Sequence, residues 1–288
     1  MTTNRKILFV AGTGRCGSTL IESALSQVND IMALGELRYI WERGLEQDRL
    51  TGAGDRFSEN LFWQNIVKNI PSKEPINPLR MRDLLFKKTI STKDISEYSR
   101  TIKELYNIMF KQAEKNILVD SSKIPNYLHA LIEADVADIY VLHITRDARA
   151  VVSSWQNPKF DKGKGAMMSS KGFFSALLES IFINRWIARD FSQHPNYHTL
   201  AYEDFCGNPR EKLSIILSWL DLSTNMNPIQ HSGDFSITTN HPTISGNPIR
   251  FEGGDIAIAL DEKWKTKLPI WQNVISSVAM YIDKKTRV

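Results

Sequence analysis

Short apolar runs alternate along this chain with stretches in which apolar residues recur at helical spacing. Continuous apolar runs of this length are typical of strands buried on both faces of a parallel sheet. The helical stretches between them supply the crossover connections that parallel strands require. We therefore predict an α/β fold with a central five-stranded parallel sheet, its strands at residues 7–11, 31–34, 117–119, 139–144 and 198–201.

The first predicted helix follows the first strand after a glycine-rich segment. Its apolar residues share one helical face, namely Leu20, Ile21, Ala24, Leu25 and Val28. Similar spacing predicts helices over 95–115, 124–134 and 269–283. Another helix begins at Asn208-Pro209, where we expect the asparagine to cap the helix and the proline to fill its first position.

Two segments lack clear periodicity. Residues 51–92 are polar and contain prolines, and together with the helix after them they are interpreted as a helical insertion, 51–115. Residues 157–172 contain glycines, lysines and serines and predict a mobile loop, either a lid over a site or an idle surface loop. Because the chain has no internal repeat, we expect a single domain, 1–288.

Charge and cysteine content narrow the class of protein. The 288 residues include 36 basic and 32 acidic side chains, a net charge of +4 that suits a small polyanion but not a nucleic-acid partner. The two cysteines are Cys16 and Cys206, and a disulfide at Cys16 would obstruct a glycine loop, which indicates a reducing compartment. We find no signal peptide and no apolar run near the ~20 residues of a membrane span, so we expect a cytoplasmic protein.

The glycine-rich loop Gly12-Thr13-Gly14-Arg15-Cys16-Gly17-Ser18-Thr19 lies between the first strand and the first helix. A strand, a turn and a helix N-terminus together present backbone N–H groups and a partial positive charge to a phosphate or sulfate. Three chemistries fit such a loop.

A dinucleotide fold is the first, because Gly12, Gly14 and Gly17 have the fingerprint spacing and Glu36 follows about 20 residues later. Against it, Glu36 follows a glycine rather than an apolar strand end, and Arg15 occupies the turn. A nucleoside triphosphatase is the second, but Ser18 replaces the lysine that such a loop requires. The third chemistry moves the cation to Arg15 and needs no metal, which suits a nucleotide with one 5′-phosphosulfate.

At these residues the chain resembles the sulfotransferase family that uses 3′-phosphoadenosine 5′-phosphosulfate (PAPS), in its bacterial and tyrosylprotein-sulfotransferase-like branch. The run 15–19 is similar to that family's 5′-phosphosulfate loop, commonly Arg-Ser-Gly-Ser/Thr-Thr, with Cys16 in place of the serine. The resemblance implies a three-layer P-loop-type fold. It also implies that the phosphosulfate is bound by Gly14, Arg15, Cys16, Gly17, Ser18 and Thr19.

A second segment, 145–155, strengthens the resemblance because it is similar to the family's 3′-phosphate segment. Arg146 follows the fourth strand, and Ser154 lies about two helical turns further along the next helix. By resemblance the two hold the 3′-phosphate, whereas a lone arginine there would more often form a surface ion pair.

Two further segments carry the expected chemistry. Leu34-Gly35-Glu36-Leu37 is similar to the element with the catalytic carboxylate in this branch, which implies Glu36 as general base rather than a helix-start acid. Asp120-Ser121-Ser122-Lys123 resembles the family's Asp-Ser-Ser-Lys segment. Lys123 would then stabilise transition-state charge with Arg15, or it is a solvated lysine at a helix start.

The remaining expected contacts lie late in the chain. Tyr202 is similar to a tyrosine beside the adenine in relatives, or it belongs to the core. Residues 241–251 resemble a loop that closes over the nucleotide, which implies Asn247 and Arg250 as 3′-phosphate donors, although their glycine and prolines predict a turn regardless. His143 is expected in the core, and Pro195 separates His194 from His198, so we predict no metal site.

The resemblance implies sulfuryl transfer from PAPS to a hydroxyl, or less often an amine, of a small-molecule, glycan or lipid acceptor lying under 51–92 and 157–172. The product would be 3′-phosphoadenosine 5′-phosphate (PAP). Two alternatives stay open at this stage: a metal-dependent phosphotransferase, and a nucleotide-binding module without catalysis. The sequence indicates neither the acceptor nor the oligomeric state.

Overall fold

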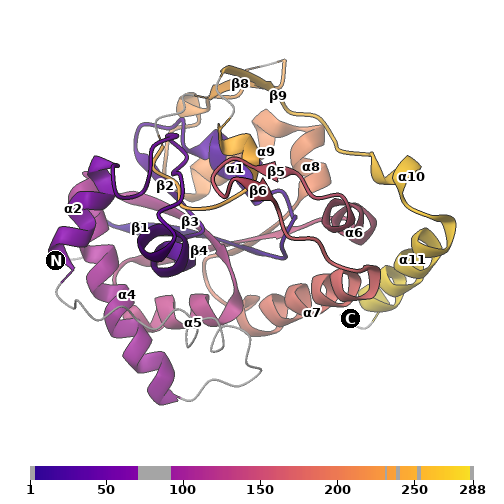
Figure 1. Ribbon diagram of the computed structural model, residues 1–288, viewed down its shortest axis with the longest axis horizontal. Coiled ribbons are helices and arrows are strands. Elements are labelled where there is room, and N and C mark those ends of the chain that lie inside the picture. Colours follow the sequence, from indigo (N-terminus) through magenta and orange to yellow (C-terminus); the bar gives the residue numbers. More distant parts are fainter. Residues whose placement is uncertain (1–3, 71–91, 231, 238–240, 252–253, 286–288) are drawn as a thin grey trace.

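A five-stranded parallel sheet forms the centre of the computed structural model, which describes residues 4–70, 92–230, 232–237, 241–251 and 254–285 (Figure 1). All five predicted strands are confirmed. In the order β2-β3-β1-β4-β7, they are β2 Ile31–Gly35, β3 Ile117–Lys123, β1 Lys6–Gly12, β4 Asp138–Thr145 and β7 Tyr197–Ala201.

The register of the strands determines which loops meet at the carboxyl edge of the sheet. Strand β1 pairs in parallel with both β3 and β4, so Ala11 lies opposite Lys123 and Gly12 lies opposite Ile144. Strand β3 extends to Lys123, past the apolar run that predicted it. The loops after β1, β3 and β4 therefore meet at one edge, which is where open α/β sheets bind ligands.

Helices cover both faces of the sheet and confirm the three-layer architecture. Alternate residues of β1 belong to two separate cores, with Leu8 in one and Phe9 in the other. The core around Leu8 packs against α1 Ser18–Leu25, α8 Tyr202–Gly207 and α9 Pro209–Trp219. The core around Phe9 packs against α2 Leu61–Asn69, α4 Thr92–Ala113, α5 Pro125–Ala134 and α7 Phe173–Phe191.

The remaining elements of the described chain are three α-helices, two short hairpins and several short helical segments. Helix α6 Ala148–Gln156 follows β4, and α10 Trp264–Lys267 and α11 Ile270–Lys285 close the described chain. Two short hairpins pair β5 Phe160–Asp161 with β6 Ala166–Met167, and β8 Asp234–Ile237 with β9 Gly254–Ala257. Short 3₁₀ turns occur at η1 Leu37–Tyr39, η3 Thr224–Met226 and η4 Pro248–Phe251, and η2 Ile40–Glu46 is a seven-residue π-helix.

Several helix predictions are confirmed and others are refined. Helices α4, α5 and α11 occupy the expected ranges, and the expected loop 157–172 contains the β5–β6 hairpin. Helix α7 was not predicted. Pro209 fills the first position of α9, but the side chain of Asn208 accepts no capping hydrogen bond, because its backbone (φ −139°, ψ 64°) departs from the extended conformation that caps usually adopt. In the insertion, α2 is present, and residues 71–91 lie outside the described part of the chain.

Among the described helices, none combines the length and apolar character that crossing a membrane requires.

Candidate active site

A cavity of about 630 Å³ opens at the carboxyl edge of the sheet. Its lining brings together residues that are far apart in the sequence: Gly14, Arg15, Gly17, Ser18, Thr19, Glu36, Lys123, Arg146, Ser154, Tyr202 and Asn247. Eleven of the thirteen site residues predicted from the sequence thus share one cavity.

The glycine loop connects β1 to α1 in the geometry that anion binding requires. Gly17 is the N-terminal cap of α1 and has a φ of +97°, a conformation that favours glycine. A Cβ atom at this position would lie 2.3 Å from Cδ2 of Tyr202, so the ring of Tyr202 packs directly on the loop. The first amides of α1 have no acceptor within the helix and are available to an anion.

Arg15 extends from the loop toward the β5–β6 hairpin. Its guanidinium carbon lies 4.7 Å from the ring centre of Trp155, and its Nη1 and Nη2 donate to Sδ of Met168 (3.1 Å) and the carbonyl of Ser169 (3.4 Å). Burial lowers the pKa of Arg15, although charges at Glu36 and Asp161 oppose this effect. The segment 157–172 therefore contacts the cation of the anion loop.

Arg146 lies at the carboxyl end of β4, against the opposite side of the loop. Its Nη1 donates to the carbonyl of Arg15 at 3.0 Å, and its guanidinium stacks on the ring of Tyr202 at 4.4 Å. Nη2 forms an ion pair with Asp261 at 3.2 Å. Arg146 thus connects three parts of the site: the glycine loop at Arg15, the ring of Tyr202, and Asp261 in the chain before α10.

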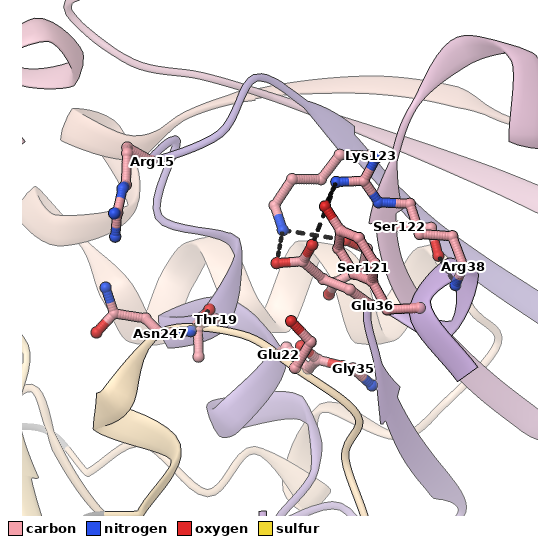
Figure 2. Close-up of polar contacts among 12 residues, drawn as sticks. Arg15, Thr19, Glu22, Gly35, Glu36, Arg38, Ser121, Ser122, Lys123 and Asn247 are labelled. Carbon is pink, nitrogen blue, oxygen red and sulfur yellow. Dashed lines mark hydrogen bonds and ion pairs between the residues drawn. The ribbon is translucent and has the colours of Figure 1, made fainter. Parts of the chain in front are cut away.

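Glu36 and Lys123 form an ion pair within the cavity, as Figure 2 shows. Nζ of Lys123 lies 2.9 Å from Oε1 of Glu36 and donates to the carbonyl of Ser121 at 3.1 Å. Nη2 of Arg38 approaches Oε2 of Glu36 at 3.4 Å. Burial by itself would raise the pKa of Glu36, but the charges of Lys123, Arg38 and Arg43 together lower it to about 2.

The backbone at Glu36 is fixed by the loop 241–251. The amide of Glu36 donates to the carbonyl of Ile244 at 2.7 Å, and the amide of Ile244 donates to the carbonyl of Leu34 at 2.8 Å. Gly35 between them has a φ of +78°, and a Cβ there would lie 2.3 Å from the carbonyl oxygen of Ile244. Only glycine fits this close approach, which is the reason for the Gly-Glu pair.

Two buried carboxyl groups lie next to the segments that carry Glu36 and Lys123. Glu22 of α1 accepts a hydrogen bond from the amide of Gly35 at 2.7 Å, and burial raises its pKa to about 7. Asp120 of β3 accepts from the amide and hydroxyl of Ser122 at 2.8 and 2.5 Å, and burial raises its pKa to about 6. Ser122 in turn accepts from the amide of Arg38 at 3.0 Å.

Two predicted residues do not line the cavity. Cys16 is fully buried, its side chain lies in the core with Leu8, and burial raises the pKa of its thiol. Arg250 donates to the carbonyls of Thr243 (3.4 Å) and Leu50 (3.2 Å), and burial lowers its pKa to about 10. Arg250 therefore holds the loop 241–251 in place beside the cavity.

The cavity also includes residues that the sequence did not reveal as site residues: Arg38, Tyr39, Arg43, Trp155 and Asp261. Arg38 and Arg43 both stack on Tyr39, at 4.3 and 3.4 Å from the ring centre. The sequence offered one signal for these residues, namely aromatic residues close to basic ones: Tyr39 between Arg38 and Arg43, and Trp155 four residues before Lys159. Asp261 carries no comparable signal, because it lies 115 residues after its partner Arg146.

His143 lies in the core, as predicted. It is buried in β4, and its ring nitrogens lie within hydrogen-bond distance of Tyr197 and Asn184. Over the described part of the chain, no group of three or more His, Cys, Asp or Glu side chains is placed to hold a metal ion.

The sequence profile described as "Sulfotransferase family" matches residues 8–226, which include the anion loop, Glu36, Lys123, Arg146, Ser154 and Tyr202. The chain belongs to the sulfotransferase family. Of the three chemistries that fit the glycine loop, membership in this family favours the third over the dinucleotide and triphosphate interpretations. No curated protein matches the chain in sequence.

Solved sulfotransferase domains share the fold of this family member. The domain from the Synechococcus PCC 7002 olefin synthase is 18% identical with a TM-score of 0.56, covering 98% of this chain and 96% of its own. The domain from the curacin biosynthetic pathway is 21% identical with a TM-score of 0.54, covering 95% of this chain and 96% of its own. These similarities confirm the P-loop-type fold along nearly the whole chain.

Proposed function

We propose that this protein transfers the sulfuryl group of PAPS to a hydroxyl group of an acceptor, with Glu36 as general base. The observation that carries the proposal is the pair of separate cationic groups that flank one anion loop, Arg15 on one side and Arg146 on the other. A nucleotide with a 5′-phosphosulfate and a 3′-phosphate has two such anionic ends.

Buried donors without partners support the fit of this nucleotide. Within the described residues, Nε of Arg15, Nε of Arg146 and the hydroxyl of Thr13 are buried and have no hydrogen-bond partner. Buried polar groups of native proteins are nearly always paired, so such atoms beside an anion loop indicate a bound polar ligand. Bound PAPS would supply the activated sulfuryl group, with PAP as the leaving group.

The residues have distinct roles in this proposal. Backbone amides of residues 17–19 and the guanidinium of Arg15 bind the phosphosulfate. Arg146, Ser154 and Asn247 hold the 3′-phosphate, and the ring of Tyr202 packs beside the adenine. Arg250 supports the loop that carries Asn247, rather than meeting the nucleotide itself.

Lys123 has two roles, because its ammonium group now neutralises Glu36. A carboxylate with a pKa of about 2 is a weak base. When Lys123 turns toward the sulfuryl and bridging oxygens, Glu36 loses its nearest cation and becomes more basic. The acceptor oxygen then bonds to sulfur as its proton passes to Glu36, and the bond between sulfur and the phosphate oxygen breaks to leave PAP.

The cavity residues that have no role toward the nucleotide in this proposal include cationic, aromatic and apolar side chains, and we assign them to the acceptor. They are Arg38, Tyr39, Arg43, Ile124 and Ile183. The sulfotransferase domains of similar fold come from a bacterial olefin synthase and the curacin pathway, as their titles state. Because both domains belong to biosynthetic systems for small organic molecules, they support a small-molecule acceptor over a glycan or a lipid.

Calorimetric titration tests the nucleotide assignment directly. We expect tight binding of PAP without metal and at least about 100-fold weaker binding of ATP with Mg²⁺ or of NADH, because neither offers a separate 3′-phosphate for Arg146. A preference for ATP with Mg²⁺ would instead identify a phosphotransferase. Labelled PAPS and an acceptor panel then test catalysis, and binding without transfer to any acceptor would identify a nucleotide-binding module.

A further inference from the structure

Helices α7 and α11 lie side by side and run in the same direction. At one end, the ring centres of Phe173 and Phe174 lie 5.0 and 6.5 Å from that of Trp271. Toward the other end, Arg185 of α7 forms an ion pair with Asp283 of α11. Figure 1 shows α7 along the lower edge of the molecule, with α11 meeting it near the C-terminus. A small core shared with α6 holds both helices against the body of the protein.

The outer surface of this helix pair is apolar, and we call it the α7–α11 face. Its side chains recur every three or four residues on each helix, which produces one continuous stripe per helix. Between 38% and 84% of each of these side chains is exposed: Phe174, Leu178 and Phe182 on α7, and Ile270, Trp271, Val274, Ile275 and Val278 on α11.

The apolar and polar faces of α11 are reversed relative to those of an ordinary surface helix. Such a helix turns its apolar stripe inward and its polar residues toward water. In α11, Gln272 and Ser276 are buried, and among the described residues Oε1 of Gln272 and Oγ of Ser276 have no hydrogen-bond partner. The outward apolar stripe is therefore not explained by the packing of this chain alone.

The size of the α7–α11 face matches that of a stable interface. At roughly 150–250 Å² for an aromatic side chain, somewhat less for an aliphatic one, and about half exposure, its eight residues present on the order of 800 Å². The largest apolar patch on an ordinary monomer is about 300–600 Å². A standard protein–protein interface buries about 800 Å² on each partner.

Charge distinguishes between a protein partner and a lipid surface. Interfacial membrane helices are rich in Lys and Arg. The exposed stripes themselves, residues 174–182 and 270–278, contain no Lys or Arg and one charge, that of Glu179, whereas the basic residues of the two helices come after the stripes. Because Glu179 already forms an ion pair with Lys171, two identical copies of this face can meet without strong repulsion between like charges.

We propose that the α7–α11 face binds a second copy of this chain. Two-fold symmetry would place the same face on both protomers and pack two helices from each into an intermolecular four-helix bundle. Glu179 and Ile183 of α7 line the active-site cavity, so the interface would lie on a helix that also forms one wall of that cavity.

Sedimentation of the full chain tests the proposal. We expect a dimer with a dissociation constant of about 1 µM or tighter, the range of interfaces of this size. Hydrogen exchange should be slower in α7 and α11 at high protein concentration than at low concentration. A chain that still sediments as a monomer at a concentration about 100-fold above this dissociation constant overturns the proposal. A monomer that binds phosphatidylcholine–phosphatidylserine vesicles also overturns it and identifies a membrane surface.

Substitutions of exposed residues locate the interface without disturbing the protomer. Leu178→Glu and Val274→Glu each place two like charges across a two-fold interface, so each should weaken the dimer about 100-fold or more. Leu61→Glu is the matched control, because Leu61 is 75% exposed on α2, away from this face. A dimer that tolerates both face substitutions, or that is lost equally in Leu61→Glu, contradicts the assignment. Circular dichroism of each monomer verifies that the fold is retained.

Discussion

Nζ of Lys123 and Oε1 of Glu36 lie 2.9 Å apart at the carboxyl edge of the sheet. Lys123 is buried and only 15% of the Glu36 side chain is exposed, so each group neutralises the other where an unpaired charge would be costly. In the proposed reaction both groups act on the reactants, the lysine on sulfuryl oxygens and the glutamate on the acceptor proton. Under the proposed reaction the ion pair is a resting arrangement, and bound nucleotide would compete with Glu36 for Lys123.

Removing the charge of Glu36 should separate binding from chemistry. In Glu36→Gln we expect PAP affinity to stay within a few-fold, whereas turnover should fall roughly 100-fold or more, the scale of a lost general base. Single-turnover assays with labelled PAPS measure the effect. Glu104→Gln, an exposed position on α4, is the control. Full activity in Glu36→Gln would assign the proton transfer to another group.

Arg146 should account for the recognition of the 3′-phosphate. Arg146→Ala removes a charge-assisted contact, so PAP should bind about 2 kcal/mol more weakly, and adenosine 5′-phosphosulfate, which lacks the 3′-phosphate, should be affected much less. Titration calorimetry with both ligands measures the difference. Arg149→Ala is the matched control, because Arg149 lies three residues further along, in the first turn of α6, but outside the cavity, and it pairs with Asp147. Equal losses for the two ligands would contradict the assignment.

Asp261 should oppose nucleotide binding. Its carboxylate pairs with Arg146 at 3.2 Å, in competition with any phosphate there. In Asp261→Asn the competing charge is lost, so PAP should bind about 1 kcal/mol more tightly, an amount typical of a partly exposed ion pair. Asp255→Asn, on an exposed strand residue, controls for the change in net charge. Weaker binding in Asp261→Asn would show that Asp261 contacts the nucleotide itself.

Glu22 should make stability depend on pH. Burial raises its pKa to about 7 in the folded protein, whereas an unfolded glutamate titrates near 4.5. The folded state therefore retains a proton that the unfolded state loses, and stability falls as the pH rises from 4.5 to 7. Glu22→Gln cannot ionise and keeps an acceptor for the amide of Gly35, so it should be on the order of 2 kcal/mol more stable than the parent at pH 8.

Urea unfolding of both proteins at pH 4.5 and pH 8 measures this dependence. The gain from Glu22→Gln should vanish at pH 4.5, where Glu22 is protonated in the fold. The same difference at both pH values would mean that Glu22 does not titrate in this range.

The sequence predicts the sheet well because its strands are continuous apolar runs. The end of strand β3 was not predicted, because residues 120–123 are polar. In the structure they continue the strand, and tertiary hydrogen bonds allow them to be buried there. Helix α7 lacks a one-sided pattern, since it buries Phe173 and Ile187 but exposes Phe174 and Phe182. An apolar residue on both sides of a helix hides the periodicity on which such predictions depend.

The site is less completely predictable than the fold. Motif residues such as Arg15 and Arg146 are identified because they border a strand end or a glycine turn. Arg38 lies in a 3₁₀ turn and Arg43 in a short π-helix after β2, where the spacing typical of an α-helix does not show which side chains face the cavity. The position of Arg250 depends on carbonyl groups of Thr243 and Leu50, which no local pattern connects.

The order of the sheet, with β1 at its centre, has a consequence for folding. The cavity takes residues from Gly12 to Lys263, so it exists only after contacts between distant parts of the chain have formed. Such contacts form late and slowly compared with local ones. Occupancy of the cavity should then stabilise the chain as a whole, by about 2.7 kcal/mol at a nucleotide concentration 100 times its Kd. A rise in melting temperature with PAP would thus report that the chain has completed its fold.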